Sequence, residues 1–212
     1  MDRYQKLIAE VSACRICLDR PRTKPLPHDP RPVLQPSRRA QILIAGQAPG
    51  TRVHASGRPF TDPSGVRLRD WLGITPEVFY DPRHLAILPM GFCFPGLTPS
   101  GADLPPRPEC APAWRSRLLA EMPQISLIVC LGAHAMRWHM GGVFEGSVDR
   151  AVRNWEAAMK LHPAVMPLPH PSWRNNAWLK ANPWFERDLL PVLKTEVAQR
   201  LRTGLARGDE AV

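Results

Sequence analysis

Four short apolar segments are separated by longer stretches in which apolar residues recur at helical spacing. Residues 41–46, 85–90, 127–132 and 164–168 are almost wholly apolar, as strands of a parallel sheet are when both of their faces are buried. The stretches around them have a helical pattern. This pattern predicts helices over residues 3–13, 65–72, 111–121, 133–140 and 148–160, and a last helix from Pro183 to about Arg202.

Strands that alternate with helices predict an α/β fold with right-handed crossovers. We expect a three-layer α/β/α sandwich whose central, mostly parallel sheet has four strands, in a single domain that covers residues 1–212. Residues 1–40 are expected to form an N-terminal helix and a Pro-rich arm, and residues 203–212 a frayed tail. The 25 prolines are scattered between apolar segments, which favours stiff loops over a Pro-rich linker.

Charge and hydropathy narrow the choice of partners. The formal net charge is +9, which is typical of a protein that binds a polyanion, nucleic acid before membrane, although a merely basic soluble protein has the same charge. No apolar run approaches the ~20 residues of a membrane span, and residues 1–10 lack the apolar stretch of a signal peptide. We therefore expect a cytoplasmic protein, a monomer without membrane contact.

Three unusual segments follow the carboxyl ends of predicted strands: residues 47–60, 91–110 and 169–176. Ligands of open α/β sheets bind at this edge. The first segment begins Gly46-Gln47-Ala48-Pro49-Gly50, and such glycines allow a tight turn and close backbone approach to a ligand. In the last segment Pro169 and Pro171 hold His170 stiffly, in a structural or a functional role.

Five cysteines in a chain without a secretory signal favour metal or cluster ligation over disulfides. Cys14 and Cys17 form a C-x2-C pair after the first helix, whereas Cys93 and Cys110 enclose a loop rich in Pro and Gly. Four thiolates suit either tetrahedral zinc or a [4Fe–4S] cluster, and their spacing does not separate the two. Cys130 lies within a predicted strand and is expected to be a buried, unreactive thiol.

The two loops together resemble the active-site motifs of the uracil-DNA glycosylase superfamily, a loop of the type GQ/E-x-P-G and a loop of the type HPS. The first loop, with Gly57-Arg58-Pro59-Phe60 after it, is most similar to that of the bacterial and archaeal iron–sulfur branch. The resemblance spans roughly residues 14–182. That branch shares the cysteine layout, so the resemblance favours a [4Fe–4S] cluster, with zinc as the alternative.

The resemblance implies a DNA glycosylase that hydrolyses the N-glycosidic bond of uracil or another deaminated base in DNA. A glycosylase extrudes its target nucleotide from the duplex. Phe60 would then stack on the base, His170 would donate to the oxyanion that develops on it, and Gln47 would orient the attacking water. The remaining expected contacts to substrate or DNA are Gly46, Ala48, Pro49, Gly50, Ser172, Arg174, Asn175 and Asn176, with Trp173 as a candidate wedge.

The chain departs from the iron–sulfur branch at three places. Gln47 replaces a glutamate, residues 52–54 replace acidic residues, and Pro89 replaces an asparagine that recognises uracil. These changes leave open weak activity, another base, or help from a group such as Asp62 or His54. The alternative function is a DNA-binding iron–sulfur protein of the same fold with little or no glycosylase activity. An NAD-binding enzyme is disfavoured, because no G-x-G-x-x-G follows the first strand.

Overall fold

The structure, a computed structural model, describes residues 1–209 and contains one four-stranded sheet. The strands are β1 Ile42–Ala45, β2 Leu85–Ile87, β3 Leu127–Leu131 and β4 Ala164–Leu168. They are ordered β2-β1-β3-β4, and every neighbouring pair is parallel. The predicted parallel α/β sheet is therefore confirmed, and the carboxyl ends of all four strands lie at one edge.

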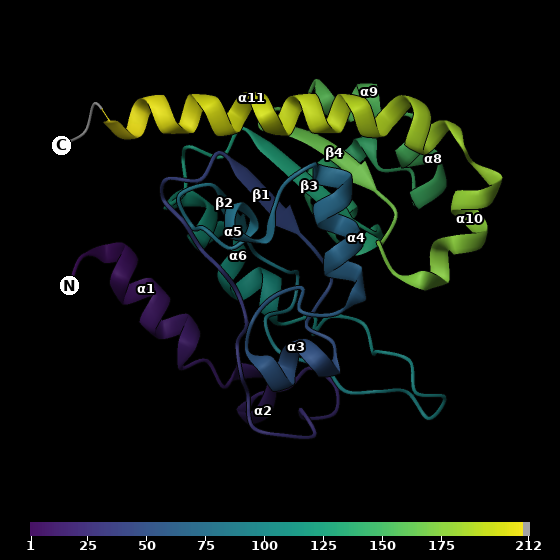
Figure 1. Cartoon of the computed structure of the whole chain (residues 1–212). Coiled ribbons are helices and arrows are strands. Elements are labelled where there is room, and N and C mark those ends of the chain that lie inside the picture. The colour runs from purple at the N-terminus through teal and green to yellow at the C-terminus, as the bar shows by residue number, and fades with distance from the viewer. Residues whose placement is uncertain (210–212) are drawn as a thin grey trace.

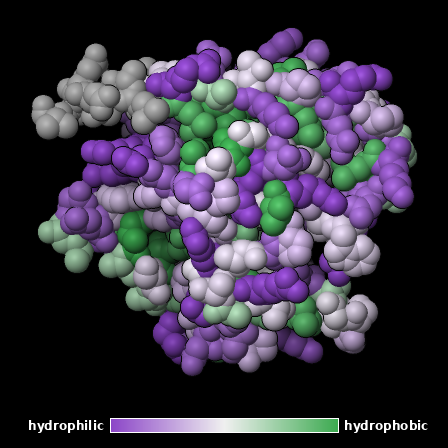
Figure 2. All heavy atoms as spheres, in the orientation of Figure 1, coloured by the Kyte–Doolittle hydropathy of each residue, from purple (hydrophilic) through white to green (hydrophobic). Residues whose placement is uncertain are grey.

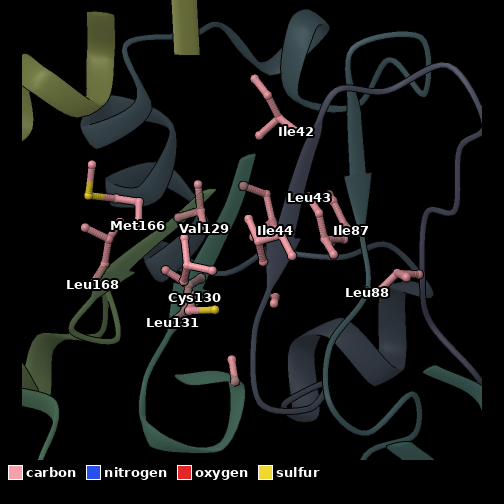
Figure 3. Packing of buried hydrophobic residues seen from close by; sticks show 14 of the residues in the cluster. Ile42, Leu43, Ile44, Ile87, Leu88, Val129, Cys130, Leu131, Met166 and Leu168 are labelled. Atoms are coloured by element: carbon pink, nitrogen blue, oxygen red, sulfur yellow. The ribbon is translucent and has the colours of Figure 1, made fainter. Parts of the chain in front are cut away.

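The strands form where they do because both faces of the sheet are covered. Ile42, Leu43 and Ile44 are fully buried, as are Val129 and Leu131 in the adjacent strand. Their side chains interdigitate with those of the outer strands at the centre of the molecule (Figure 3). β-branched and aliphatic side chains suit a pleated surface that is buried on both sides.

Helices flank the sheet on both sides (Figure 1). In the view of Figure 1 the long helix α11 lies above the sheet and packs on α4, whereas α6 lies below it and contacts α1. The helices are α1 Arg3–Ser12, α2 Ile16–Asp19, α3 Thr51–Ser56, α4 Pro63–Leu72, α5 Pro76–Phe79, α6 Cys110–Ala120, α7 Ala133–Met140, α8 Val148–Arg153, α9 Trp155–Met159, α10 Asn176–Ala181 and α11 Leu190–Asp209.

Most helix predictions hold, but the one over residues 148–160 is wrong in part. The chain there forms two helices, because Asn154 leaves the helical conformation with φ −99° and ψ 32°. Asparagine is a weak helix former that competes with the backbone for hydrogen bonds. Helix α10 was not predicted at all, since it is short and closely followed by Pro183.

The C-terminal helix also differs from the expectation. A π-helical turn, Phe185–Leu189, precedes Pro191, whose ring and missing N–H disturb a regular helix at that point. Helix α11 then continues through Asp209, past residue 203, where the frayed tail was expected to begin. Residues 210–212 of that predicted tail lie outside the described residues.

The predicted Pro-rich arm runs along the free edge of the sheet. Gln35 forms an antiparallel bridge with Ile87 of β2, and the Val33 N–H donates to the Phe92 carbonyl over 2.7 Å. The arm thereby lies beside the loop that follows β2. Hydrophilic residues cover most of the face that Figure 2 shows. Within the part of the chain that the structure describes, no helix is long and apolar enough to cross a membrane.

Candidate active site

An open cavity lies at the carboxyl edge of the sheet. Three of its walls come from segments that the sequence singled out: the loop after β1, the loop after β2 and the loop after β4. The lining residues are Val33, Gly46, Gln47, Ala48, Pro49, Gly50, Val53, Pro59, Phe60, Asp62, Ser64, Ile87, Pro89, Asp103 and His170.

The loop after β1 is held by the chain that follows β2. The N–H groups of Met90 and Gly91 donate to the carbonyls of Gly46 and Gln47 over 2.9 and 2.8 Å, so the parallel pairing continues past the strands. The Gln47 side chain extends toward Gly132, with Nε2 3.1 Å from the place a Cβ would take there. Gly132 has φ +83°, a conformation that glycine adopts without strain. A bare Gly132 therefore makes room for the Gln47 amide.

Phe60 lies over the same loop in an uncommon conformation. Its φ is +53°, which costs a bulky side chain free energy and persists only where the surroundings enforce it. Tyr80 Oη donates to the Phe60 carbonyl over 3.0 Å, and the ring meets Phe79 edge to face with centroids 5.8 Å apart. The Phe60 Cζ atom is 3.5 Å from the position of a Cβ on Gly46. The ring is thus fixed as one wall of the cavity.

His170 projects from the loop after β4 into the opposite wall. Burial lowers its pKa below the ordinary 6.5, while the carboxylates of Asp62 and Asp103 act in the opposite direction. The imidazole is therefore neutral near pH 7 and carries one N–H that it can donate. Asn175 Nδ2 donates to the His170 carbonyl over 2.6 Å, so that amide holds the backbone of the histidine loop.

Two carboxylates line the cavity beside Gln47 and His170. Asp62 caps helix α4: its Oδ1 accepts from the Gly65 N–H over 3.3 Å and from Ser64 Oγ over 2.7 Å. Asp103 belongs to the long loop between Cys93 and Cys110. Asp103 could not be recognised from the sequence, although its loop could, because nothing in the local pattern shows which residue of that loop turns toward the sheet.

Several expected site residues lie outside this cavity. Ser172, Arg174, Asn175 and Asn176 are not among its lining residues, but form the turn that directly follows His170. Trp173, in the same turn, is 71% exposed, as a wedge would be before it meets a duplex. His54 does not line the cavity either. Its ring packs at a tilt against that of His28, with centroids 4.3 Å apart, which argues against His54 as the missing catalytic group.

Four arginines that lie close in the sequence to residues of the cavity have no carboxylate partner. Arg52 and Arg58 neighbour its lining residues, Arg67 Nη1 donates to the Ser172 carbonyl over 3.1 Å, and Arg174 follows the histidine loop. Among residues 1–203 none of these four forms an ion pair, whereas arginines elsewhere, such as Arg83 and Arg153, do. Guanidinium groups without a carboxylate partner are suited to bind phosphates.

The four cysteines expected to bind a cluster line a second, apolar pocket. Cys14 and Cys17 come from the region of α1 and α2, Cys93 from the loop after β2, and Cys110 from the start of α6. All five cysteines are free thiols. Cys130, by contrast, is fully buried inside β3, in agreement with its expected structural role. Residues nearly 100 positions apart in the sequence thus meet in one pocket.

Two of the four sulfurs in that pocket accept a hydrogen bond. Trp114 Nε1–H donates to Cys14 Sγ over 3.2 Å, and the Phe92 backbone N–H donates to Cys110 Sγ over 3.3 Å. Donors of this kind suit anionic sulfur ligands and tune an iron–sulfur cluster. The donor set therefore fits a thiolate-bound cluster. No group of three or more His, Cys, Asp or Glu side chains in the described residues is placed to hold a metal ion.

The fold and the cavity define an α/β protein with a pocket at the carboxyl edge of its sheet, an aromatic wall and a facing histidine. Residues 33–194 match the family model of the uracil DNA glycosylase superfamily. Because the match covers well over half of the chain, the chain belongs to this superfamily. Membership indicates a glycosylase-type function and DNA binding.

Proposed function

We propose that this protein hydrolyses the N-glycosidic bond of uracil or another deaminated base in DNA. The observation that carries the proposal is the convergence of Gln47, Phe60 and His170, from the loops after two different strands, on one cavity. Unpaired arginines beside that cavity suit the phosphates of a DNA strand. The aromatic wall suits a planar base that has left the stack.

The geometry supports a division of roles. Phe60 stacks on the extruded base, because its ring is fixed between Gly46 and Phe79. When the bond from C1′ to the base nitrogen breaks, its electron pair goes to the base, and the neutral His170 donates an N–H to the resulting oxyanion. Water adds to C1′, held by the Gln47 amide. The water gives up one proton to solvent and the base anion takes one up, so the products are the free base and an abasic site.

Pro89 sets a limit on how the base is recognised. It lines the cavity where the iron–sulfur branch carries an asparagine, and a proline offers neither a side-chain amide nor a backbone N–H. Arg115 Nη1 donates to the carbonyls of Leu88 and Pro89 over 3.0 and 3.1 Å, which fixes this wall. The protein therefore cannot select uracil with a side-chain amide at this position. We expect it to accept a broader range of deaminated bases than enzymes that carry the asparagine.

We further propose a [4Fe–4S] cluster on Cys14, Cys17, Cys93 and Cys110. Its support is the common apolar pocket and the hydrogen bonds that the sulfurs of Cys14 and Cys110 accept. Such a cluster would cross-link the N-terminal helices to both ends of the loop after β2. A zinc ion is the alternative occupant, and metal analysis of anaerobically purified protein distinguishes the two.

The decisive experiment compares wild type, His170→Ala and His84→Ala on oligonucleotides that contain uracil, hypoxanthine or xanthine. His84 lies at the amino end of β2, away from the cavity. Under single-turnover conditions His170→Ala should lose roughly 10²–10³ in rate, as for removal of one oxyanion donor, while the control keeps wild-type speed. A wild-type protein that binds these duplexes but releases no base would favour the DNA-binding alternative. Gln47 and Pro89, which replace a glutamate and an asparagine of the iron–sulfur branch, are the residues that keep this alternative open.

A further inference from the structure

The proposed reaction needs a negatively charged group near the sugar, and Gln47 does not supply one. As C1′ loses the base it gains positive charge, and the attacking water must lose a proton. An uncharged amide orients water well but is a poor proton acceptor. Among the residues that line the cavity, Asp62 and Asp103 are the two carboxylates, so the structure offers two candidates.

Asp62 is already engaged. Its Oδ1 atom binds the hydroxyl of Ser64 and the N–H of Gly65, and this interaction caps helix α4. A carboxylate oxygen that is held by these two donors is not free to turn toward a substrate. Moving it toward a substrate would also release the helix end that supports Phe60. Asp62 therefore has a structural task that conflicts with proton transfer.

Asp103 has no such engagement. Among residues 1–203, no hydrogen bond or ion pair to its carboxylate is found, and the residue is exposed at the cavity rather than buried in its floor. Its Oδ2 atom lies 3.4 Å from the position that a Cβ would take on Gly50. The absent side chain at Gly50 leaves the carboxylate against the loop that carries Gln47. Its negative charge also acts on His170 across the cavity.

The backbone holds Asp103 in place although the residue lies on a loop. Asp103 pairs with Leu97 in an antiparallel bridge, and the Leu104 N–H donates to the Gly96 carbonyl over 2.9 Å. The chain is buried on both sides of this hairpin, at Cys93 before it and at Cys110 after it. A group on such a tethered hairpin is positioned well enough to act on a bound substrate.

We propose that Asp103 is the catalytic carboxylate of this enzyme, in place of the acidic residue that the first motif lacks. In the step, the bond from C1′ to the base nitrogen breaks and its electrons leave with the base, which His170 stabilises. The carboxylate of Asp103 stabilises the positive charge on C1′ and accepts one proton from water as the oxygen bonds to C1′. That proton then passes to solvent. This inference rests on the proposed glycosylase function.

An unpaired carboxylate at the mouth of a basic site repels phosphates, which distinguishes a catalytic role from a binding role. Asp103→Asn should slow single-turnover base release by about 10²–10⁴, the range for a general acid or base, and should leave DNA affinity equal or higher. Asp103→Glu should retain more activity than the asparagine variant. Asp188→Asn, which removes one exposed negative charge on the C-terminal helical segment, serves as the control for net charge and should keep the wild-type rate.

The outcomes separate this inference from the proposed function. A wild-type enzyme that releases base, together with an equally fast Asp103→Asn variant, overturns the role of Asp103 and leaves the glycosylase function intact. Equal losses in the Asn and Glu variants, with lowered thermal stability in both, also overturn it, since they indicate a structural role. A wild-type protein that releases no base from any substrate overturns both. Slow release by a folded, DNA-binding Asp103→Asn variant with partial activity in Asp103→Glu supports the proposal.

Discussion

His139 accepts a hydrogen bond from the buried guanidinium of Arg115, and this pair makes the stability of the protein sensitive to acid. Arg115 Nε lies 2.9 Å from His139 Nε2, and Arg115 is fully buried. Protonation of His139 would remove the acceptor and place two cations side by side. Burial, and secondarily the Arg115 charge, lowers the pKa of His139 to about 3.

The sign and size of the effect follow from proton linkage. In the unfolded chain a histidine has a pKa near 6.5, so below that pH the unfolded state binds a proton that the folded state does not. The free energy of unfolding therefore falls as the pH drops from 6.5 toward 3. Each pH unit in this window costs about 1.4 kcal/mol, so lowering the pH from 7.5 to 5.0 should remove about 2 kcal/mol.

The perturbation that isolates this contribution is His139→Gln, which keeps an acceptor near the position of Nε2 but does not titrate. Urea unfolding at pH 7.5 and pH 5.0, followed by tryptophan fluorescence, should show that wild type loses about 2 kcal/mol more than the variant over that interval. Other histidines and the carboxylates titrate equally in both proteins. Equal losses in the two proteins would show that His139 keeps an ordinary pKa in the fold and would refute the assigned buried pair.

Three further outcomes are expected. Gly65→Ala should destabilise the fold by about 1–3 kcal/mol, because a Cβ there would overlap the Phe60 carbonyl oxygen, whereas Gly142→Ala meets no atom within 4 Å and should change the thermal unfolding temperature little. DNA affinity should fall steeply between low and physiological salt, and Arg174→Ala should reduce the logarithmic salt slope by about one; a flat salt dependence would contradict phosphate binding. Cys93→Ser should lose bound iron, about four atoms per chain in wild type, whereas Cys130→Ala should retain it; a colourless wild type with one zinc would exclude the cluster.

The sequence by itself determined the sheet. Residues 42–45 and 127–131 are continuous apolar stretches, and such segments have few alternatives to a strand buried on both faces. Helices with strong caps and apolar spacing, such as α4 and α7, were predictable for the same local reason. The break at Asn154 and the π-helical turn before Pro191 were not, because each depends on how a weak helix former or a proline packs against the rest of the fold.

Part of the candidate site could also be predicted from local sequence. Gln47, Phe60 and His170 stand in motifs whose glycines and prolines restrict the backbone, and these motifs directly follow strands whose carboxyl ends share one edge. Once the strands are parallel, these side chains must approach one another. The pairing of Cys14 and Cys17 was likewise visible in their spacing, whereas the meeting of this pair with Cys93 and Cys110 rested on resemblance alone.

Tertiary structure decided the rest, because the relevant distances join segments far apart in the chain. Only folding brings the Asp103 carboxylate next to Gly50, and only folding shows that Asp62 caps helix α4. Only folding turns Asn175 back onto the His170 carbonyl. Side chains on long loops have no periodic signal, so their direction is set by the surfaces against which the loop closes. The pattern of apolar residues specifies where the site lies, and the packing of loops specifies which charged groups enter it.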